Sequence, residues 1–473
     1  MQIFEEFNPF RRKYKKGLRR VALVYPNRYV GGIANIGLQY IYAKANEVAI
    51  CERFYTDAFG GLRSVESATP LKEFDIALFS LQYEMDYFKA VEIIKKSGFS
   101  GIKIAGGPCV MENPKPVKKY FDAFFIGEAE DVIEELVLAK DKEELKGIKG
   151  VYTGEEDKVE RVCSKLKKHL ETEIIGEGAY GKCFLIEIGR GCIRRCRFCI
   201  VRRIYFPPRW RKPDDFPEVK GVNKVALIAP SPSDHPKFKD ILASLIERGF
   251  EVSPSSIRAD TLDEELVELL KMGNLKTLTI APETASQRLV DVLNKGIKPE
   301  DVIRSSQIAK DFEKIKLYFM IGLPGENFED IKNIVRLAVE VRKIVKRVEV
   351  SVNPLVPKPH TPFQWLPFSG DEDVKKGLAE LRRKMQYIRK GCKKFKIEVD
   401  IGNIREFSIQ TILSRGDEDV SMIFEGVHYS KFQKYLEKID VDRELPWDFI
   451  DHGYKKKDLI SEFLSVQNSL SSR

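Results

Sequence analysis

Three cysteines on one short loop are the residues of this chain best suited to chemistry. Cys192, Cys196 and Cys199 are spaced C-x3-C-x2-C, and they follow an apolar run at 184–188 and a turn bracketed by glycines. Three thiolates on one loop can hold three irons of a cubane iron–sulfur cluster, which leaves the fourth iron without a protein ligand. A substrate or cofactor can bind to that open iron.

A different kind of metal site would need a fourth protein ligand close to this loop. The next cysteine upstream, Cys183, stands at the start of the apolar run, and neither cysteine nor histidine occurs between Cys199 and Asp234. A non-enzymatic iron–sulfur or zinc-binding module remains an alternative to an enzyme. Metal analysis distinguishes the two, because a cubane gives about four irons per chain and a zinc module gives zinc.

The cysteine loop resembles that of the radical S-adenosylmethionine (SAM) superfamily. In that family the loop follows the first barrel strand, an aromatic residue precedes the last cysteine, and SAM chelates the open iron. Phe198 occupies the aromatic position, which in the family packs near adenine. The resemblance implies a [4Fe-4S] cluster on Cys192, Cys196 and Cys199, and SAM cleaved reductively to a 5′-deoxyadenosyl radical for C–H activation. It also implies an electron donor of the flavodoxin or ferredoxin type.

Length and composition describe a chain of several domains. With 473 residues it is too long for one ordinary core, and its 43% hydrophobic and 32% charged residues are typical of a globular protein. No apolar run approaches the roughly 18 residues of a membrane helix, and the N-terminus lacks a signal-peptide pattern. Eight scattered cysteines favour a reducing compartment. These features predict a cytoplasmic protein without a transmembrane segment.

Positive charge is concentrated in two basic runs, within a net charge of +9. Such runs can meet the phosphates of RNA or of lipid headgroups, or simply form a solvated face. The first run contains Arg11, Arg12, Lys13, Lys15, Lys16, Arg19 and Arg20, and the second contains Arg190, Arg194, Arg195, Arg197, Arg202, Arg203, Arg209, Arg211 and Lys212.

Residues 1–140 predict a Rossmann-like, doubly wound domain behind a basic arm at 1–20. Short apolar runs alternate with helical patterns, as in a parallel sheet with crossover helices. Ligands in such sheets bind beyond the carboxyl ends of the strands, here 25–32, 80–84 and 106–108. The domain resembles the cobalamin (B12)-binding type that precedes the barrel in one branch of the superfamily. However, the D-x-H-x-x-G motif is absent and no histidine precedes His169. Cobalamin bound without a protein histidine and a fold that has lost the cofactor are both open.

The rest of the chain predicts a linker, a barrel and a terminal module. Residues 141–182 are a linker with a hairpin at 150–153 and 159–162. Residues 183–390 alternate strands and helices, with six strands at 184–188, 224–229, 252–257, 275–280, 315–320 and 348–352. This series fits the radical SAM partial (β/α)6 TIM barrel. Residues 391–473 are a small α+β module, and segments at 356–365, 408–417 and 445–453 resemble a mostly uncharacterised subgroup of the superfamily.

The carboxyl ends of the barrel strands are where chemistry is expected. Arg258 suits the SAM carboxylate, because a guanidinium gives bidentate geometry, and an Arg258–Asp260 pair is the alternative. Glu283 can accept from SAM hydroxyls or its amino group, with Arg288 balancing its charge.

The remaining strand ends offer a glycine turn and several polar side chains. Gly322 and Gly325 form a tight turn that lies beside adenine in the family. Asp234 or the serines at 231 and 233 are candidates to substitute for the missing SAM-amino contact, although a plain Ser-Pro turn is the favoured interpretation. His235 is a candidate proton donor. Lys358 and His360 either face substrate or serve at the surface and in packing, respectively. The predicted reaction is C–H functionalisation such as cobalamin-dependent C-methylation, and an RNA- or lipid-modifying radical SAM enzyme without cobalamin is the alternative.

Overall fold

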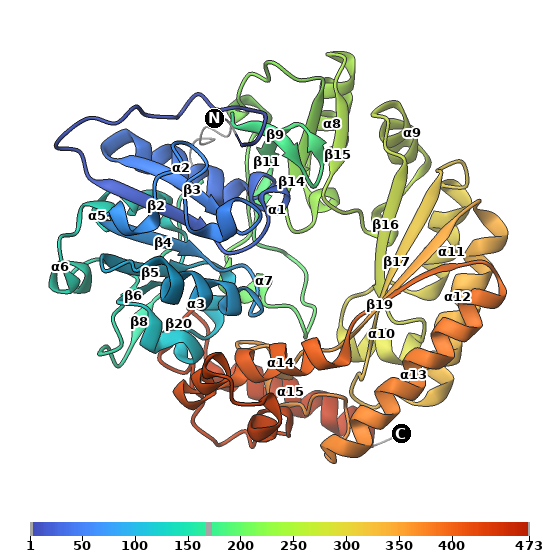
Figure 1. The fold of residues 1–473 in the computed structure, drawn as a ribbon. Helices are drawn as coiled ribbons and strands as arrows, with labels where there is room; N and C mark the ends of the chain where they lie inside the picture. Colours follow the sequence, from blue (N-terminus) through green and yellow to red (C-terminus); the bar gives the residue numbers. More distant parts are fainter. Residues whose placement is uncertain (1–2, 167–172, 472–473) are drawn as a thin grey trace.

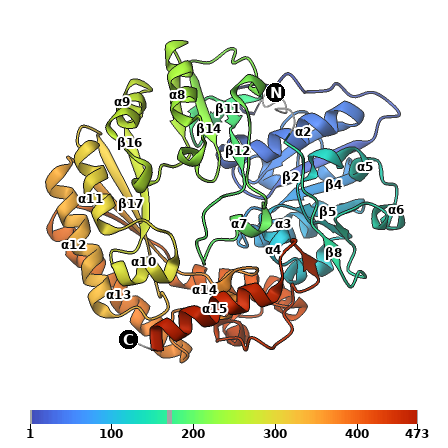
Figure 2. The ribbon, with the colours of Figure 1, turned by 180° about the vertical axis from the view of Figure 1, so that it is seen from behind.

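The protein consists of two α/β domains joined along one side by the C-terminal segment (Figure 1; Figure 2 from behind). The structure is a computed structural model that describes residues 3–166 and 173–471. His169 lies outside the described residues. None of the helices in these two ranges is both long enough and apolar enough to cross a membrane.

The N-terminal domain is a doubly wound sheet, as predicted. Its strand order is β3-β2-β4-β5-β6-β7, and every neighbouring pair is parallel except β6 with β7. The order reverses between β2 and β4, which places a ligand crevice at their carboxyl ends. The strands are β2 (Arg20–Tyr25), β3 (Ile50–Tyr55), β4 (Ile76–Ser80), β5 (Ile102–Gly106), β6 (Ala123–Phe125) and β7 (Val151–Tyr152).

Helices cover both faces of this sheet, which explains why its strands read as continuous apolar runs. Alternate residues of the strands contribute to two different cores, one of them shared with the barrel. On one face lie α2 (Ile36–Val48) and α5 (Ile133–Leu138), and on the other α3 (Asp86–Ser97) and α4 (Pro108–Glu112). Two short helices, α1 (Tyr29–Ile33) and α6 (Lys142–Lys146), complete the domain.

The barrel is open, because its strands form two separate sheets. One has the order β11-β14-β15 and the other β16-β17-β18-β19, all parallel, and within the described residues no ladder joins β15 to β16. The six predicted strands are present and β19 is a seventh. Their bounds are β11 (Phe184–Glu187), β14 (Lys224–Ile228), β15 (Glu251–Pro254), β16 (Thr277–Glu283), β17 (Lys314–Ile321), β18 (Val348–Pro354) and β19 (Glu398–Ile401).

Helices follow the barrel strands and line its outer side (Figure 1). The helices are α8 (Phe238–Glu247), α9 (Glu264–Met272), α10 (Gln287–Leu293), α11 (Pro299–Ile308), α12 (Phe328–Ile344) and α13 (Val374–Lys394). α9, α12 and α13 begin at an N-capping side chain; for example, Asn327 accepts hydrogen bonds from the amides of Glu329 and Asp330.

The predicted hairpin at 150–153 and 159–162 is wrong. β7 pairs antiparallel with β6, whereas β8 (Val159–Glu160) pairs in parallel with β20 (Ile450–Asp451) from the C-terminal segment. Tyr152 packs between Phe124 and Phe449, with ring centroids 6.2 and 4.3 Å away. Packing of the Tyr152 ring against residues distant in sequence therefore determines the position of β7, and the turn residues between 153 and 158 do not produce a hairpin.

The predicted N-terminal arm is anchored to the domain that follows it. β1 (Glu6–Phe7) pairs with β9 (Ile175–Gly178), which in turn pairs with β10 (Gly181–Lys182). The Glu6 carboxylate accepts a hydrogen bond from the Tyr29 hydroxyl at 2.8 Å and forms an ion pair with buried Arg53.

The C-terminal segment contacts both domains. It contains α14 (Ile404–Arg415), β20 and α15 (Lys456–Ser471). The Asn113 side-chain amide, in the N-terminal domain, donates to the carbonyls of Ser414 and Gly416 at 3.1 and 2.7 Å. The limits assigned to the domains from sequence stay a prediction.

Lys358 and His360 lie in the contact between the loop after β18 and the N-terminal domain. The Lys358 ammonium pairs with Glu84 and with Glu112, the latter at 3.1 Å. The His360 ring contacts the Tyr454 hydroxyl at 2.5 Å and the Glu112 carbonyl at 3.0 Å. Both side chains are committed to protein partners, so the expectation that they face substrate is not supported by their contacts.

Glu112 in this contact generates a prediction about pH. Burial raises the pKa of Glu112 to about 8, although Lys358 opposes the rise. Because the pKa of Glu112 is higher in the folded state than in the unfolded state, protonated Glu112 stabilises the fold. This contribution is complete below the pKa of the unfolded state and is lost as pH rises through about 8. Glu112→Gln should therefore flatten the fall of the denaturation midpoint between pH 6 and 9, measured in urea. Glu329→Gln, on an exposed face of α12, is the control, and equal slopes in wild type and Glu112→Gln would contradict the assignment.

Candidate cluster and cofactor site

The cysteine loop leaves the first barrel strand through a tight glycine turn. Gly191 has φ +77°, and a Cβ atom there would lie 2.3 Å from the Tyr205 carbonyl oxygen, so a side chain cannot be accommodated. The loop starts after β12 (Gly189–Arg190), passes through α7 (Val201–Ile204) and ends at β13 (Arg209–Trp210), which pairs antiparallel with β12. The two ends of the loop are thereby held together.

The three cysteines are free thiols with partly exposed side chains. Burial raises the pKa of Cys192, Cys196 and Cys199, in the last case to about 12. Lys295 and Arg258 oppose this rise at Cys196, so positive charge already faces the position of a thiolate. The two cations therefore offset part of the cost of forming a thiolate at Cys196.

The arrangement fits a cluster better than a single metal ion. In the described parts of the chain, no group of three or more His, Cys, Asp and Glu side chains could hold one metal ion. A cubane places each thiolate on a different iron, so its ligands need not converge on one point. Three free thiols on one loop therefore fit a [4Fe-4S] cluster.

The cysteine loop is docked on the end of α10. The Arg197 amide donates to the Leu293 carbonyl at 3.0 Å, and its guanidinium donates to the carbonyls of Asp291 and Val292 at 2.7 and 2.8 Å. The Asn294 side chain donates to the Arg195 carbonyl at 3.2 Å. The loop conformation is therefore held by protein contacts on its outer side.

Arg258 adopts the alternative arrangement considered from sequence. Its guanidinium donates to both carboxylate oxygens of Asp260 at 2.8 Å and to the Lys295 carbonyl at 2.9 Å. The side chain is buried and lies close enough to influence the pKa of Cys192 and Cys196.

Glu283 lies at the carboxyl end of β16, where the strand is irregular. Its φ of +67° is rare for a residue with a side chain, and the register with β17 shifts between Ile280 and Glu283. The carboxylate pairs with Lys295 at 2.5 Å. The expectation that Arg288 balances Glu283 is wrong, because Arg288 pairs with Asp330 at 2.6 Å.

Lys295 is the site residue that sequence reasoning missed. Its ammonium bonds Glu283, lies 5.9 Å from the centre of the Phe198 ring, and lowers the pKa of Cys196 and Cys199. Lys295 directly follows Asn294, whose left-handed conformation, with φ 53°, ends α10. A cation immediately after a helix-ending asparagine is the available signal, and it is a weak one.

The glycine turn after β17 packs against α13 of the barrel and α15 of the C-terminal segment. A Cβ atom at Gly322 would lie 3.2 Å from Leu381, and one at Gly325 would lie 2.4 Å from Leu470. Both residues have positive φ, at 76° and 71°. These protein contacts account for the two glycines, and their role beside adenine stays a prediction.

Asp234 and His235 have structural partners. Asp234 accepts hydrogen bonds from Arg194 of the cysteine loop, with Nε 3.0 Å from Oδ2. The His235 Nδ1 accepts from the Lys237 amide at 3.0 Å, which leaves Nε2 to donate to the Arg211 carbonyl at 3.0 Å. With both ring nitrogens engaged, the interpretation of His235 as a proton donor is not supported.

Most of the second basic run is paired inside the molecule. Arg194 binds Asp234, while Arg197 and Arg203 pair with Glu462 at 3.3 and 3.4 Å. Arg190, Arg209 and Arg211 bind buried carboxylates at the domain junction. These side chains balance internal charge and leave little for phosphate.

A cavity of about 330 Å³ opens at the carboxyl edge of the N-terminal sheet. Apolar side chains of β2, β4, β5, β6, α2 and α5 line the cavity, together with Ser80, Gln82 and 106–108 from two of the predicted strand ends. The third predicted segment, 25–32, contributes no lining residue. The barrel contributes Glu187, Arg190 and 228–230 to the opposite wall. Oε2 of Glu130, which also lines the cavity, is buried without a hydrogen-bond partner.

Comparison with protein families gives two matches. Residues 186–338 match the radical SAM superfamily, and residues 37–151 match the N-terminal domain of radical SAM proteins. An uncharacterized protein of Methanocaldococcus jannaschii is 41% identical over 88% of this chain and 92% of its own length. An uncharacterized methyltransferase of Pyrococcus horikoshii is 26% identical over 64% of this chain and 72% of its own length.

Solved structures show the same fold at low identity. OxsB, a cobalamin-dependent SAM radical enzyme with aqua-cobalamin and SAM bound, matches 96% of this chain and 80% of its own, with a TM-score of 0.54 and 14% identity. TsrM of Kitasatospora setae, a radical SAM methyltransferase with tryptophan and a SAM analogue bound, matches 70% of this chain and 72% of its own, with a TM-score of 0.53 and 14% identity.

Lys295 gives the prediction for this site. Lys295→Met removes the ammonium that lowers the pKa of Cys196, so this thiol should react several-fold more slowly with iodoacetamide at pH 8 in iron-free protein. The rate is measured by mass spectrometry of the peptide that carries Cys196. Lys310→Met, on an exposed surface, should leave the rate unchanged. A wild-type rate in Lys295→Met would show that the ammonium does not act on this thiol.

Proposed function

Because the chain belongs to the radical SAM superfamily and is a radical SAM enzyme, we propose that Cys192, Cys196 and Cys199 hold a [4Fe-4S] cluster that binds SAM. A cluster held by these three cysteines would supply, when bound and reduced, the electron for reductive cleavage of SAM and thereby the chemistry of C–H activation. The observation that carries this proposal is the docked loop with its three free thiols and the cations that face them.

The chain's own residues would bind and orient SAM. Phe198 would pack near adenine, with Gly322 and Gly325 at the same group, and Glu283 would accept from the ribose hydroxyls or the amino group. Arg258 would meet the SAM carboxylate with donors beyond those it gives to Asp260. The protein's part in such chemistry is to position the cofactor and to exclude water and competing hydrogen donors.

We further propose cobalamin-dependent methylation at carbon as the reaction. The cavity at the carboxyl edge of the N-terminal sheet faces the barrel, and the cobalamin-dependent OxsB shares the fold. TsrM, which also shares the fold, is a radical SAM methyltransferase, and the Pyrococcus horikoshii relative is named as an uncharacterized methyltransferase.

The fit of the cavity to cobalamin is partial. Its volume of about 330 Å³ lies near the lower limit of ligand pockets, ~300–1,000 Å³. The apolar interior suits a flat apolar part of a corrinoid, such as its base, and the residues that line it include no histidine to ligate cobalt. Cobalamin would therefore bind without a protein histidine.

A cobalamin-free enzyme acting on RNA or lipid is the second candidate. It would rely on the N-terminal basic run, where Lys13, Lys15 and Lys16 are exposed, because most of the second run is paired internally. Steeply salt-dependent RNA binding would support it. In either case the reductant would be a flavodoxin- or ferredoxin-type donor, in a cytoplasmic, reducing setting.

Replacement of the three cysteines tests the cluster. The triple variant Cys192→Ala, Cys196→Ala and Cys199→Ala, reconstituted without oxygen, should lack the brown chromophore and should form no 5′-deoxyadenosine from SAM. Cys392→Ala, a buried cysteine far along the chain, should retain both. SAM cleavage by the triple variant would end the proposal.

Reconstitution with hydroxocobalamin tests the methylation proposal. The protein should retain a cobalt absorption band after gel filtration and should form S-adenosylhomocysteine together with 5′-deoxyadenosine. Leu78→Trp, which enlarges a side chain of the apolar core that lines the cavity, should reduce cobalamin retention while leaving iron content unchanged. Formation of 5′-deoxyadenosine by protein that retains no cobalamin would favour the cobalamin-free alternative.

A further inference from the structure

The two ends of the cysteine loop, β12 and β13, form a short antiparallel pair that places two arginines opposite each other; we call this pair the clasp. β12 pairs antiparallel with β13 in the register Arg190↔Arg209, and residues 191–208, which include all three cysteines, lie between them. Like charges directly opposite each other in an antiparallel pair repel. The clasp therefore needs a negative charge between the two guanidinium groups.

Glu128 of the N-terminal domain supplies this charge. Its Oε2 accepts from Nη1 of Arg190 and from Nη1 of Arg209, both at 3.0 Å, and its Oε1 accepts from Nη2 of Arg209 at 2.5 Å. The side chain is 1% exposed. One carboxylate thus bridges both strands of the clasp in a site shielded from water, where charge interactions are strong.

Residues 162–164 of the segment after β8 hold Glu128 in place. Its amide donates to the Val162 carbonyl at 3.1 Å, and the Ser164 amide donates to its Oε2 at 3.0 Å. The segment continues directly from β6, so the carboxylate is held by the N-terminal sheet.

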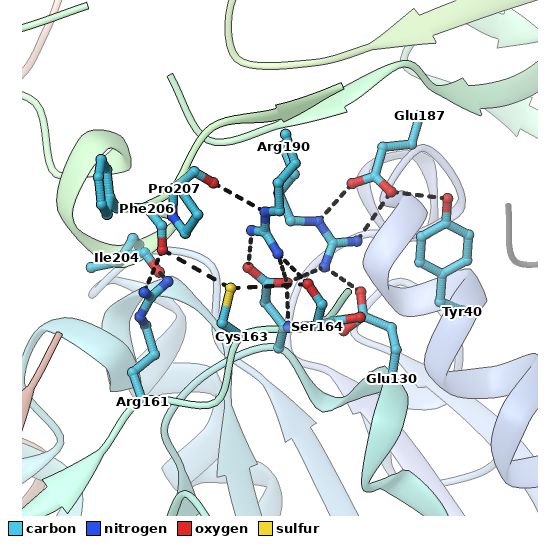
Figure 3. Close-up of polar contacts among 12 residues, drawn as sticks. Tyr40, Glu130, Arg161, Cys163, Ser164, Glu187, Arg190, Ile204, Phe206 and Pro207 are labelled. Carbon is cyan, nitrogen blue, oxygen red and sulfur yellow. Dashed lines mark hydrogen bonds and ion pairs between the residues drawn. The ribbon is translucent and has the colours of Figure 1, made fainter. Parts of the chain in front are cut away.

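Two further carboxylates, Glu130 and Glu187, lie beside the clasp and pair with Arg190. Arg190 also pairs with Glu130 at 2.5 Å and with Glu187 at 2.7 Å, and Arg211 pairs with Glu187 at 2.8 Å. Figure 3 shows Arg190 between Glu187 on one side and Glu130 on the other. Arg209 pairs with Glu128 and otherwise donates to the backbone carbonyls of Pro207 and Ser164.

We propose that Glu128 is a positioning residue for the cluster loop, through which the N-terminal domain completes the cluster site of the barrel. It acts through Arg190 and Arg209 and touches no reacting atom. The proposal rests on the proposed function only in that the loop holds a cluster. The state of the clasp itself can be measured in iron-free protein.

Limited trypsin digestion of iron-free protein tests the clasp. The loop contains Arg194, Arg195, Arg197, Arg202 and Arg203 as cleavage sites. Glu128→Gln keeps the size of the side chain and removes its charge, so cleavage within 191–208, mapped by mass spectrometry, should accelerate at least about tenfold. Glu128→Asp keeps the charge but shortens the side chain, so cleavage within 191–208 should be intermediate between wild type and Glu128→Gln. This variant replaces Glu128→Gln in the test if Glu128→Gln does not fold.

Glu349→Gln is the matched control. Glu349 on β18 also bridges two cations, Lys314 at 2.6 Å and Lys316 at 2.7 Å, away from the loop. Its loss should leave cleavage within 191–208 unchanged. The double variant Glu128→Gln with Arg209→Gln removes the repulsion as well as the carboxylate, so its cleavage should return toward the wild-type rate.

Spectroscopy of the reconstituted protein gives the second measurement. The electron paramagnetic resonance spectrum of the reduced cluster should change in Glu128→Gln and stay unchanged in Glu349→Gln. Wild-type cleavage and spectrum in both Glu128 variants would overturn the proposal, as would acceleration spread evenly over the whole chain. Absence of SAM cleavage in wild-type protein would count against the proposed function and leave the digestion result standing.

Discussion

A charge buried in a protein must face an opposite charge, and the junction of the two α/β domains is built to meet this condition. Glu187 ends the first barrel strand with its side chain 5% exposed. Two arginines, Arg190 and Arg211, surround it from the barrel, and the Tyr40 hydroxyl on α2 donates to it at 3.3 Å from the N-terminal domain. Removal of one member would leave an uncompensated buried charge, which typically costs about 3–5 kcal/mol. The relative position of the domains is therefore fixed where the cysteine loop begins.

The same condition explains the unusual arginine content around the cysteines. Seen only in sequence, a run of arginines beside a cluster motif suggests a surface for anions. In the folded chain, Arg194 meets Asp234, and Arg258 meets Asp260. The charges that face the thiols come from Arg258 after β15, from Lys295 between α10 and α11 and, at Cys192, also from Arg194 of the loop. The loop's own arginines mostly hold its conformation, and Arg258 and Lys295 add positive charge from other segments of the barrel.

The sequence was sufficient for the strands that are buried on both faces and insufficient for features that depend on distant partners. β11 and β17 were placed within one or two residues, because parallel strands under helices are continuous apolar runs. β19 was missed because Glu398 and Asp400 alternate with apolar residues at the polar edge of its sheet. The hairpin failed because the ring of Tyr152 packs against Phe449, almost 300 positions away along the chain.

The cluster site shows the same division. The spacing of the cysteines is local, so the motif could be read directly from the sequence. The partner of Glu283 could not be read from the sequence, because Arg288 and Lys295 are both near it along the chain. The end of α10 places Lys295 beside Glu283, while Arg288 pairs with Asp330. Glu128 and Glu130 gave no signal, because their partner Arg190 lies about 60 residues further along the chain.

Arg190 connects the two sites on which the function depends. It lines the cavity of the N-terminal domain, and it stands two positions before Cys192. Its guanidinium is held by Glu128 and Glu130, which line the same cavity. A ligand that fills the cavity must therefore contact the carboxylates and the guanidinium that hold the base of the cysteine loop. Arg190 therefore belongs both to the lining of the cavity and to the base of the cysteine loop.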